Sequence, residues 1–344
     1  MPDDAPSTPP APPGREGWRR LRRNRAAVAS LWFLLAITLA SFFGPFFIAG
    51  EKKASSPAVF KAPGASATLP VFDPADATKV TGQREVTYWL GSDDLGRDVL
   101  HRSLAGAQVS LIVGLAAAAI NLAIGVAYGL AAGYFGGRVD GAMMRLVDLL
   151  YAIPRILIIM LLIASYEQGF VDLLDRGRLW AQGNGWKSME EFFGWLLPYN
   201  RMLVVILSLG LIEWLTMARI VRGQVLVLRE MQFVTAARAM GQRAWVIMLR
   251  HLLPNLWTVI LTYLTLTIPA VILTESFLSF LGLGIDEPAA SWGSLLKQGA
   301  QVINPLESRW WLLVFPAALL SATLLALNFL GDGLRDAFDP RSRD

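Results

Sequence analysis

Three ionisable residues interrupt otherwise apolar stretches of the sequence: Arg155, Glu213 and Glu275. A charge at membrane depth is costly, so such a residue marks a functional site unless it is paired inside the protein. Two interpretations therefore fit these residues. They contact a substrate, or Arg155 forms a structural salt bridge with one of the two glutamates.

Residue types that support other chemistry are scarce. The chain has no Cys, which excludes a disulfide framework, a thiol nucleophile and a thiolate metal site. Its two histidines, His101 and His251, lie far apart in the sequence, and neither stands in a pattern that pairs a nucleophile with a base. A phosphate-binding G-x-x-x-x-G-K-[ST] loop is also absent. We therefore expect no catalytic residues, no metal site and no cofactor bound by this chain.

The elements that position these charges are membrane helices. Hydrophobic residues make up 54% of the chain and charged residues 17%, against about 45–50% and about 25% in soluble domains. This composition argues against a soluble enzyme, a disordered chain and a coiled coil. Because about 20 apolar residues span a bilayer, the sequence predicts an all-α, polytopic fold with six spans at 26–48, 108–132, 145–165, 202–221, 256–280 and 310–330.

Lys and Arg near the ends of the spans predict the orientation. Arginines cluster before the first span, between the fourth and fifth spans, and after the sixth. Cytoplasmic loops carry such an excess, so we expect both termini inside and the segments 50–106, 166–201 and 282–309 outside. The net charge of +4 is then explained without nucleic acid. The predicted units are a disordered N-terminus (1–25), a first helix (26–48), an outer loop (49–106), a transmembrane core (107–331) with a cytoplasmic loop (222–255), and a C-terminal tail (332–344).

Small residues recur every three or four positions along the second span. Such a stripe lets another helix approach closely, and Asn121 lies in the middle of it. The stripe fits either ordinary bundle packing or a position at the centre of a pore. It consists of Ser110, Gly114, Ala118, Asn121, Gly125, Gly129 and Gly133.

The fifth span places Thr258, Thr262 and Thr265 on one face, with Pro269 in the same helix. These hydroxyls fit two roles equally well. They line a polar translocation path, or they donate to their own backbone carbonyls around the proline. In the outer segment, Ser188 to Glu191 resembles a capping box that would begin a short helix.

The cytoplasmic segment between the fourth and fifth spans predicts a short helix with small residues and flanking arginines. Ala236 and Ala237 leave a shallow surface, and Gly241 is typical of the turn that ends a helix. An amphipathic helix resumes near Trp245. Such an element suits docking into a groove of a partner protein, although an ordinary interfacial helix fits the same pattern.

This segment resembles the EAA loop of ATP-binding-cassette importer permeases. The resemblance is carried by Phe233-Val-Thr-Ala-Ala-Arg-Ala-Met-Gly241 followed by Arg250-His-Leu-Leu-Pro-Asn255, and it is most similar to the subfamily that serves peptides, nickel and related solutes. Further similar blocks occur in the family's order at 90–102, 133–140, 279–284, 291–293 and 328–341, so that the resemblance covers about residues 20–341.

The sequence departs from the family's pattern at several points. Thr235 replaces the Glu that gives the loop its name, which puts a charged contact at this position in doubt. His101 replaces a usual Ser, Tyr88-Trp89 replace a usual His-Pro, and Arg155 is unexpected. The segment 166–200 is longer than the family's usual connection.

The resemblance implies the type I importer permease fold in a bacterial inner membrane. It implies four kinds of partner: the lipid bilayer, a second homologous permease, two ATPase subunits that use ATP and Mg, and an extracytoplasmic binding protein. In such complexes the loop docks on the ATPase and transmits its motion to the membrane spans. The resemblance therefore implies that the coupling residues of this chain are Arg229, Phe233, Thr235, Ala236, Ala237, Arg238 and Gly241.

Three other functions are weighed against this expectation. An ion-coupled secondary transporter would use Glu213, Glu275 and Arg155, but the two halves of the chain show no internal repeat. A membrane hydrolase would need the nucleophile and base that are missing. A purely structural membrane subunit would be distinguished by its partners. The sequence leaves the solute open among dipeptides, oligopeptides, nickel and peptide-like compounds.

Overall fold

The computed structural model describes residues 19, 21–47, 58–72, 80–287, 289–303 and 307–338. Most of the N-terminus that was predicted to be disordered lies outside these residues. Residues 21–23 are helical, however. The reason is that Leu21 is buried and packs with Ala27 and Ala337.

Six helical segments in the described part of the chain are long and apolar enough to cross a membrane, as predicted. The main helices are α2 (Arg25–Phe47), α3 (Val99–Phe135), α4 (Gly137–Tyr151), α5 (Arg155–Gly183), α6 (Lys187–Leu196), α7 (Asn200–Leu228), α8 (Gln232–Ala239), α10 (Leu253–Phe280), α11 (Trp292–Gln301) and α12 (Trp311–Phe338). Three short turns join them: η1 (Leu197–Tyr199), α9 (Ala244–Val246) and the π-helical η2 (Ile247–Leu252).

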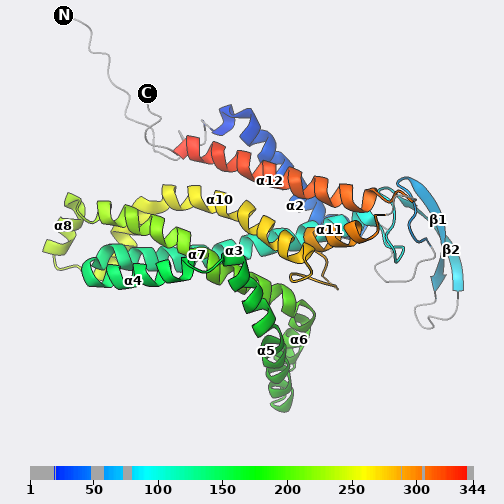
Figure 1. Cartoon of the computed structure of the whole chain (residues 1–344), viewed down its shortest axis with the longest axis horizontal. Coiled ribbons are helices and arrows are strands. Elements are labelled where there is room, and N and C mark those ends of the chain that lie inside the picture. The colour runs from blue at the N-terminus through cyan, green and yellow to red at the C-terminus, as the bar shows by residue number, and fades with distance from the viewer. Residues whose placement is uncertain are drawn as a thin grey trace, which may run out of the picture.

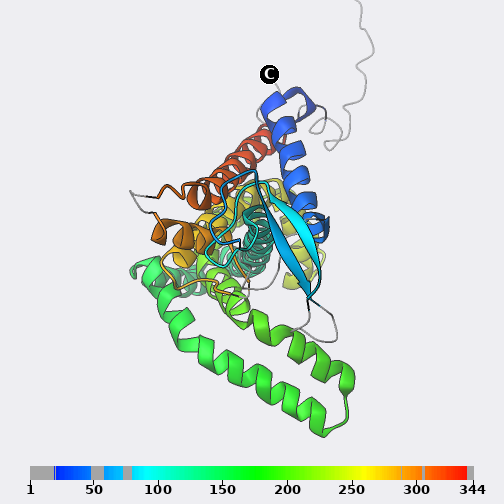
Figure 2. The ribbon, with the colours of Figure 1, turned by 90° about the vertical axis from the view of Figure 1, so that its right-hand side faces the viewer.

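The long helices run along one axis of the molecule (Figure 1). Helix α8 lies at one end of this axis, and an antiparallel hairpin of β1 (Ala65–Phe72) and β2 (Val80–Tyr88) lies at the other. Helices α5 and α6 project sideways from the bundle, as the view along the axis also shows (Figure 2). Helices α2 and α12 pack together on the opposite side.

The contact between α3 and α7 is built on the predicted stripe of small residues. A Cβ atom added at Gly125 would lie 2.6 Å from the Cβ of Met217, and one added at Gly129 would lie 2.6 Å from the carbonyl oxygen of Ala218. Gly133 packs against Val225 in the same way. The backbones approach this closely only because glycine has no side chain.

The third predicted span is wrong as a single helix. Residues 145–165 were expected to be continuous, but α4 ends at Tyr151 and α5 begins at Arg155. Pro154 explains the break, because proline lacks the backbone N–H that a helix needs and disfavours helical geometry at the preceding residue. Helix α5 then continues to Gly183, so that much of the predicted outer loop is helical.

The other outer segments also hold more structure than predicted. The expected capping box is absent from the described residues, because α6 begins at Lys187 and its N-cap, Trp186, makes no side-chain capping bond. Loop 50–106 contains the hairpin, and the segment 282–309 contains α11. A true capping box occurs at Ser291 and Ser294, which begin α11.

We predict that Gly129→Ala destabilises the protein. The added methyl group would force α3 and α7 apart, and such overpacking costs about 1–3 kcal/mol. The measurement is thermal unfolding in detergent, followed by tryptophan fluorescence. Gly141→Ala on α4 is the control, because a Cβ atom there meets no atom within 4 Å. Equal unfolding temperatures for the two variants would contradict the close contact.

Candidate functional site

Helix α8 presents one buried face and one exposed face at the end of the bundle. Val234 and Ala237 are buried in a cluster that also contains Val225 of α7 and Ile247 of η2. Phe233, Thr235, Ala236 and Arg238 are exposed on α8, and Met240 is exposed at its end. Of the predicted coupling residues, Ala237 therefore holds α8 in place, and the exposed residues form its free surface.

Arg229 ties the start of this segment to α3. Its guanidinium donates to the carbonyl oxygen of Gly133 at 3.0 Å and to the carboxylate of Glu230 at 2.9 Å. Arg238 lies over the ring of Tyr134, 5.1 Å from its centroid. Two of the predicted coupling residues thus contact the end of α3 directly, which gives α8 a mechanical link to that helix.

The turn after α8 needs a glycine. Gly241 has a φ of +74°, a left-handed conformation that other residues adopt only with strain. On its far side, Gln242 and His251 form a hydrogen bond of 2.8 Å between their side chains, which fixes the turn to η2. The turn predicted at Gly241 is confirmed, and it connects α8 to the helix that leads into α10.

The threonines of α10 donate to backbone carbonyls of their own helix, and two of them also line a cavity. The hydroxyl of Thr262 donates to the carbonyl of Thr258 at 2.9 Å, and that of Thr265 donates to the carbonyl of Thr262 at 2.8 Å. Thr258 and Thr262 also line a cavity of about 240 Å³ with Gln224 of α7 and Arg335 of α12. The threonine face of α10 therefore borders a cavity even though its hydroxyls also bond to the helix backbone.

Asn121 and Glu275 are buried within the chain. Among the described residues, Oδ1 of Asn121 lacks a hydrogen-bond partner. The partners of Glu275 within the described ranges are serine hydroxyls rather than a cation. Ser279 donates at 2.7 Å, Ser110 at 3.1 Å and Ser276 at 3.3 Å. This carboxyl group joins α10 to α3.

Arg155 pairs with Glu213. Its guanidinium lies 3.0 Å from the carboxylate, which confirms the salt bridge considered from the sequence and selects the glutamate on α7. The Arg155 side chain remains 56% exposed, whereas that of Glu213 is 10% exposed. The pair therefore stands at a surface of this chain and not inside its core.

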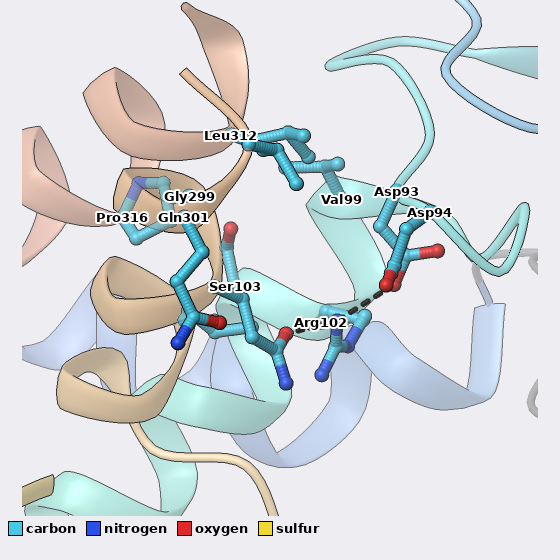
Figure 3. Close-up of a pocket in the computed structure, with 12 residues that line it drawn as sticks. Asp93, Asp94, Val99, Arg102, Ser103, Gly299, Gln301, Leu312 and Pro316 are labelled. Atoms are coloured by element: carbon cyan, nitrogen blue, oxygen red, sulfur yellow. Dashed lines mark hydrogen bonds and ion pairs between the residues drawn. The ribbon is translucent and has the colours of Figure 1, made fainter. Parts of the chain in front are cut away.

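Sequence reasoning missed a network of charged residues near the N-terminal end of α3. Arg102 contacts Asp93 at 2.6 Å and Glu287 at 3.1 Å, and Arg97 contacts the same two acids at 2.7 Å each. Figure 3 shows Arg102 pointing toward Asp93 beside a cavity of about 60 Å³ between α3, α11 and α12. Gln298 of α11 also accepts from Arg102, at 2.7 Å. Only the alternation of acids and arginines in residues 93–102 signalled this network.

Comparison with known proteins identifies the family. Residues 125–344 match the family described as binding-protein-dependent transport system inner membrane component. Residues 12–63 match the N-terminal transmembrane domain of oligopeptide transport permease C. The chain belongs to this permease family.

Similar permeases cover nearly the whole chain. The dipeptide transport system permease protein DppC of Bacillus subtilis is 38% identical over 329 residues, which are 96% of this chain and 86% of that protein. The oligopeptide transport system permease protein OppC of Escherichia coli K12 is 38% identical over 336 residues, which are 96% of this chain and 93% of that protein. The protein of that name from Haemophilus influenzae is 36% identical over 340 residues, 96% of this chain and 90% of that protein.

This permease is a multi-pass membrane subunit of a transport system. The family match fits an ATP-binding-cassette importer and does not favour the ion-coupled alternative. Within the described residues, no group of His, Cys, Asp and Glu is arranged to hold a metal ion.

The charged network at the N-terminal end of α3 predicts a pH dependence of the permease's stability. Burial opposes ionisation of Glu287, but the hydrogen bond and charge of Arg97, together with the charge of Arg102, lower its pKa below the usual value of 4.5. Because the pKa of Glu287 is lower in the folded state than in the unfolded state, its ionisation stabilises the fold at pH values above the unfolded-state pKa. This stabilisation is lost as the pH falls through the folded-state pKa.

We expect Glu287→Gln to lower the free energy of unfolding at pH 7 by at most about 1 kcal/mol, because the Glu287 side chain is 45% exposed. The difference from the unmodified protein should shrink below pH 4.5. Thermal unfolding across this pH range measures it, with Glu191→Gln, an exposed position on α6, as the control. A difference that does not change with pH would contradict the ionic origin.

Proposed function

We propose that this chain is one half of the permease of an ATP-driven importer for short peptides. An extracytoplasmic binding protein delivers the peptide. Two separate ATPase subunits supply the energy, and a second homologous permease completes the pathway. The observation that carries the proposal is α8: it is a short helix fixed at the end of the bundle by Val234 and Ala237, with a free outer surface.

The orientation follows from the position of α8. The end of the bundle that carries α8 also carries the arginines of residues 219–250, and the start of α2 and the end of α12 lie toward the same end (Figure 1). An excess of arginine is typical of cytoplasmic segments. Both termini are therefore cytoplasmic in this proposal, and the β1–β2 hairpin faces the binding protein.

ATP-driven closure of the two ATPase subunits would move α8, and two connections transmit that movement. Arg229 holds the start of the segment to the last turn of α3 through the carbonyl of Gly133. The Gln242–His251 hydrogen bond holds its other end to η2, which leads into α10. Movement of α8 thus reaches both helices, and ATP drives transport if it binds one arrangement better than the other.

Peptides are the solute class that the relatives support. The names of several relatives specify dipeptide or oligopeptide transport, and that of a further relative from Pectobacterium atrosepticum, 30% identical over 331 residues, specifies glutathione. Each of these solutes is a short peptide. We assign the same class to this chain.

The direct test is uptake by the reconstituted complex, with its partner permease, both ATPase subunits and the binding protein in proteoliposomes. Enclosed ATP and Mg should drive the accumulation of labelled peptide, and an imposed proton gradient without ATP should not. Uptake that follows the gradient and ignores ATP would overturn the proposal in favour of ion coupling.

We predict that Gly241→Leu uncouples transport. A side chain at a φ of +74° strains the backbone and reorients α8, although no described atom lies close enough to clash with a Cβ atom there. Uptake should fall by about tenfold or more, while the complex still assembles and binds ATP.

The control for this prediction is Gly183→Leu at the end of α5. A Cβ atom at that glycine also meets open space, but the residue is remote from α8 in sequence. It should leave uptake near the parental rate. ATP-driven uptake by Gly241→Leu at that rate would contradict coupling through this turn.

A further inference from the structure

A cavity opens where the third membrane-spanning segment is broken. It has a volume of about 280 Å³ and lies between the break that separates α4 from α5 and the middle of α7. Arg155, Glu213 and Thr216 supply polar groups to its wall, together with Tyr151. Its size approaches the lower end of the range of about 300–1,000 Å³ for small-molecule pockets.

The ion pair in this cavity lies near the middle of α7, far from either end of that helix. At a rise of about 1.5 Å per residue, Glu213 is about 22 Å along α7 from the end of that helix at Leu228. An arginine side chain that is 56% exposed at this depth cannot face lipid chains without a large cost. The cavity is therefore open to water or covered by a polar surface.

Further polar pairs continue from the cavity toward the α8 end. The hydroxyls of Tyr151 and Thr216 lie 2.5 Å apart, and Arg219 lies 2.6 Å from Asp148. On α7 the partners Glu213, Thr216 and Arg219 follow at three-residue intervals, which places them on one side of the helix. The Arg219 and Asp148 side chains are 42% and 66% exposed, so this row of pairs is open along its length.

A purely structural lock between α4, α5 and α7 explains the pairs less well than a binding site does. Ion pairs that only hold helices together would contribute little here, because exposed ion pairs add only about 0–1 kcal/mol to the free energy of unfolding. Arg155 instead lines the cavity and leaves more than half of its side chain exposed. In transporters, helices that are interrupted within the membrane characteristically line solute sites.

We propose that this cavity binds the two charged ends of a short peptide with free termini. Arg155 binds the terminal carboxylate, for which the planar guanidinium is suited, and Glu213 binds the terminal ammonium group. The solute replaces the 3.0 Å contact that Arg155 and Glu213 make with each other. The row formed by Tyr151–Thr216 and Asp148–Arg219 then leads the peptide toward the α8 end. This inference rests on the proposed peptide importer and assigns its specificity within the membrane.

The experiment uses the complete reconstituted complex and three labelled probes: dialanine, its C-terminal amide and its N-acetyl derivative. Each variant is compared with the unmodified complex on the same probe, so that delivery by the binding protein cancels. Arg155→Gln should lower the preference for dialanine over the amide by about tenfold, since hydrogen bonds to charged groups carry that magnitude. Glu213→Gln should lower the preference for dialanine over the N-acetyl form by a similar factor. Arg145→Gln, on an exposed position of α4 outside the cavity wall, should change neither preference.

The reciprocal pattern separates solute binding from a structural role. Loss of a structural salt bridge would lower uptake of all three probes by the same factor in both variants, and that result would overturn the inference while leaving the peptide importer intact. An unmodified complex that transports dialanine without preference for free termini would also overturn it. Failure of that complex to take up any of the probes with ATP would instead overturn the peptide assignment, and this inference with it.

Discussion

The close backbone contact between α3 and α7 is the constraint on which the rest of the structure depends. Lipid chains are as apolar as leucine, so helices in a membrane gain little from burying apolar side chains and associate through close packing instead. Gly125, Gly129 and Gly133 permit that packing by leaving room for the α7 backbone. The contact fixes α7, and α7 carries Glu213 in its middle and α8 beyond its end. Both candidate sites therefore depend on the same interface.

The chain accommodates the charged groups of its long helices in different ways. Glu275 is fully buried among serine hydroxyls that hold α3 to α10. Arg102 is nearly buried and contacts two acids at the N-terminal end of α3, where it joins α3 to the segment before α11. Arg155 alone among these three combines a position at membrane depth with a half-exposed side chain and a cavity. A charged side chain that remains exposed in this way would act only through contact with another polar group.

The sequence predicted the features that composition and local periodicity determine. Long apolar runs predicted six membrane helices, and the spacing of small residues predicted the face of α3 that contacts α7 and α10. The turn at Gly241 followed from the conformational freedom of glycine. The similar blocks predicted the family, which the comparisons confirm.

The errors arose at a proline, at a helix entry and where tertiary contacts decide the structure. Pro154 breaks the third span, although the run around it is apolar enough to suggest one helix. Helix α6 begins without the predicted cap, because its entry is set by the turn from α5 and not by Ser188. The charged network at the N-terminal end of α3 joins residues 93–102 to Glu287 and Gln298. These residues are so far apart in the sequence that local patterns cannot reveal their contact. The pairing of Arg155 with Glu213 rather than Glu275 likewise depends on which helices are neighbours.

Docking of the exposed face of α8 on an ATPase subunit is tested most directly by site-specific photocrosslinking in the complete complex. Because the natural chain has no Cys, Ala236→Cys introduces a unique thiol for a photoreactive label. Thr87→Cys, on the exposed hairpin at the other end of the molecule, is the matched control. Illumination should join the label at residue 236 to the ATPase, and the label at residue 87 should not reach it. A complex that transports its solute yet gives no crosslink from residue 236, or an equal crosslink from residue 87, would contradict the docking of α8.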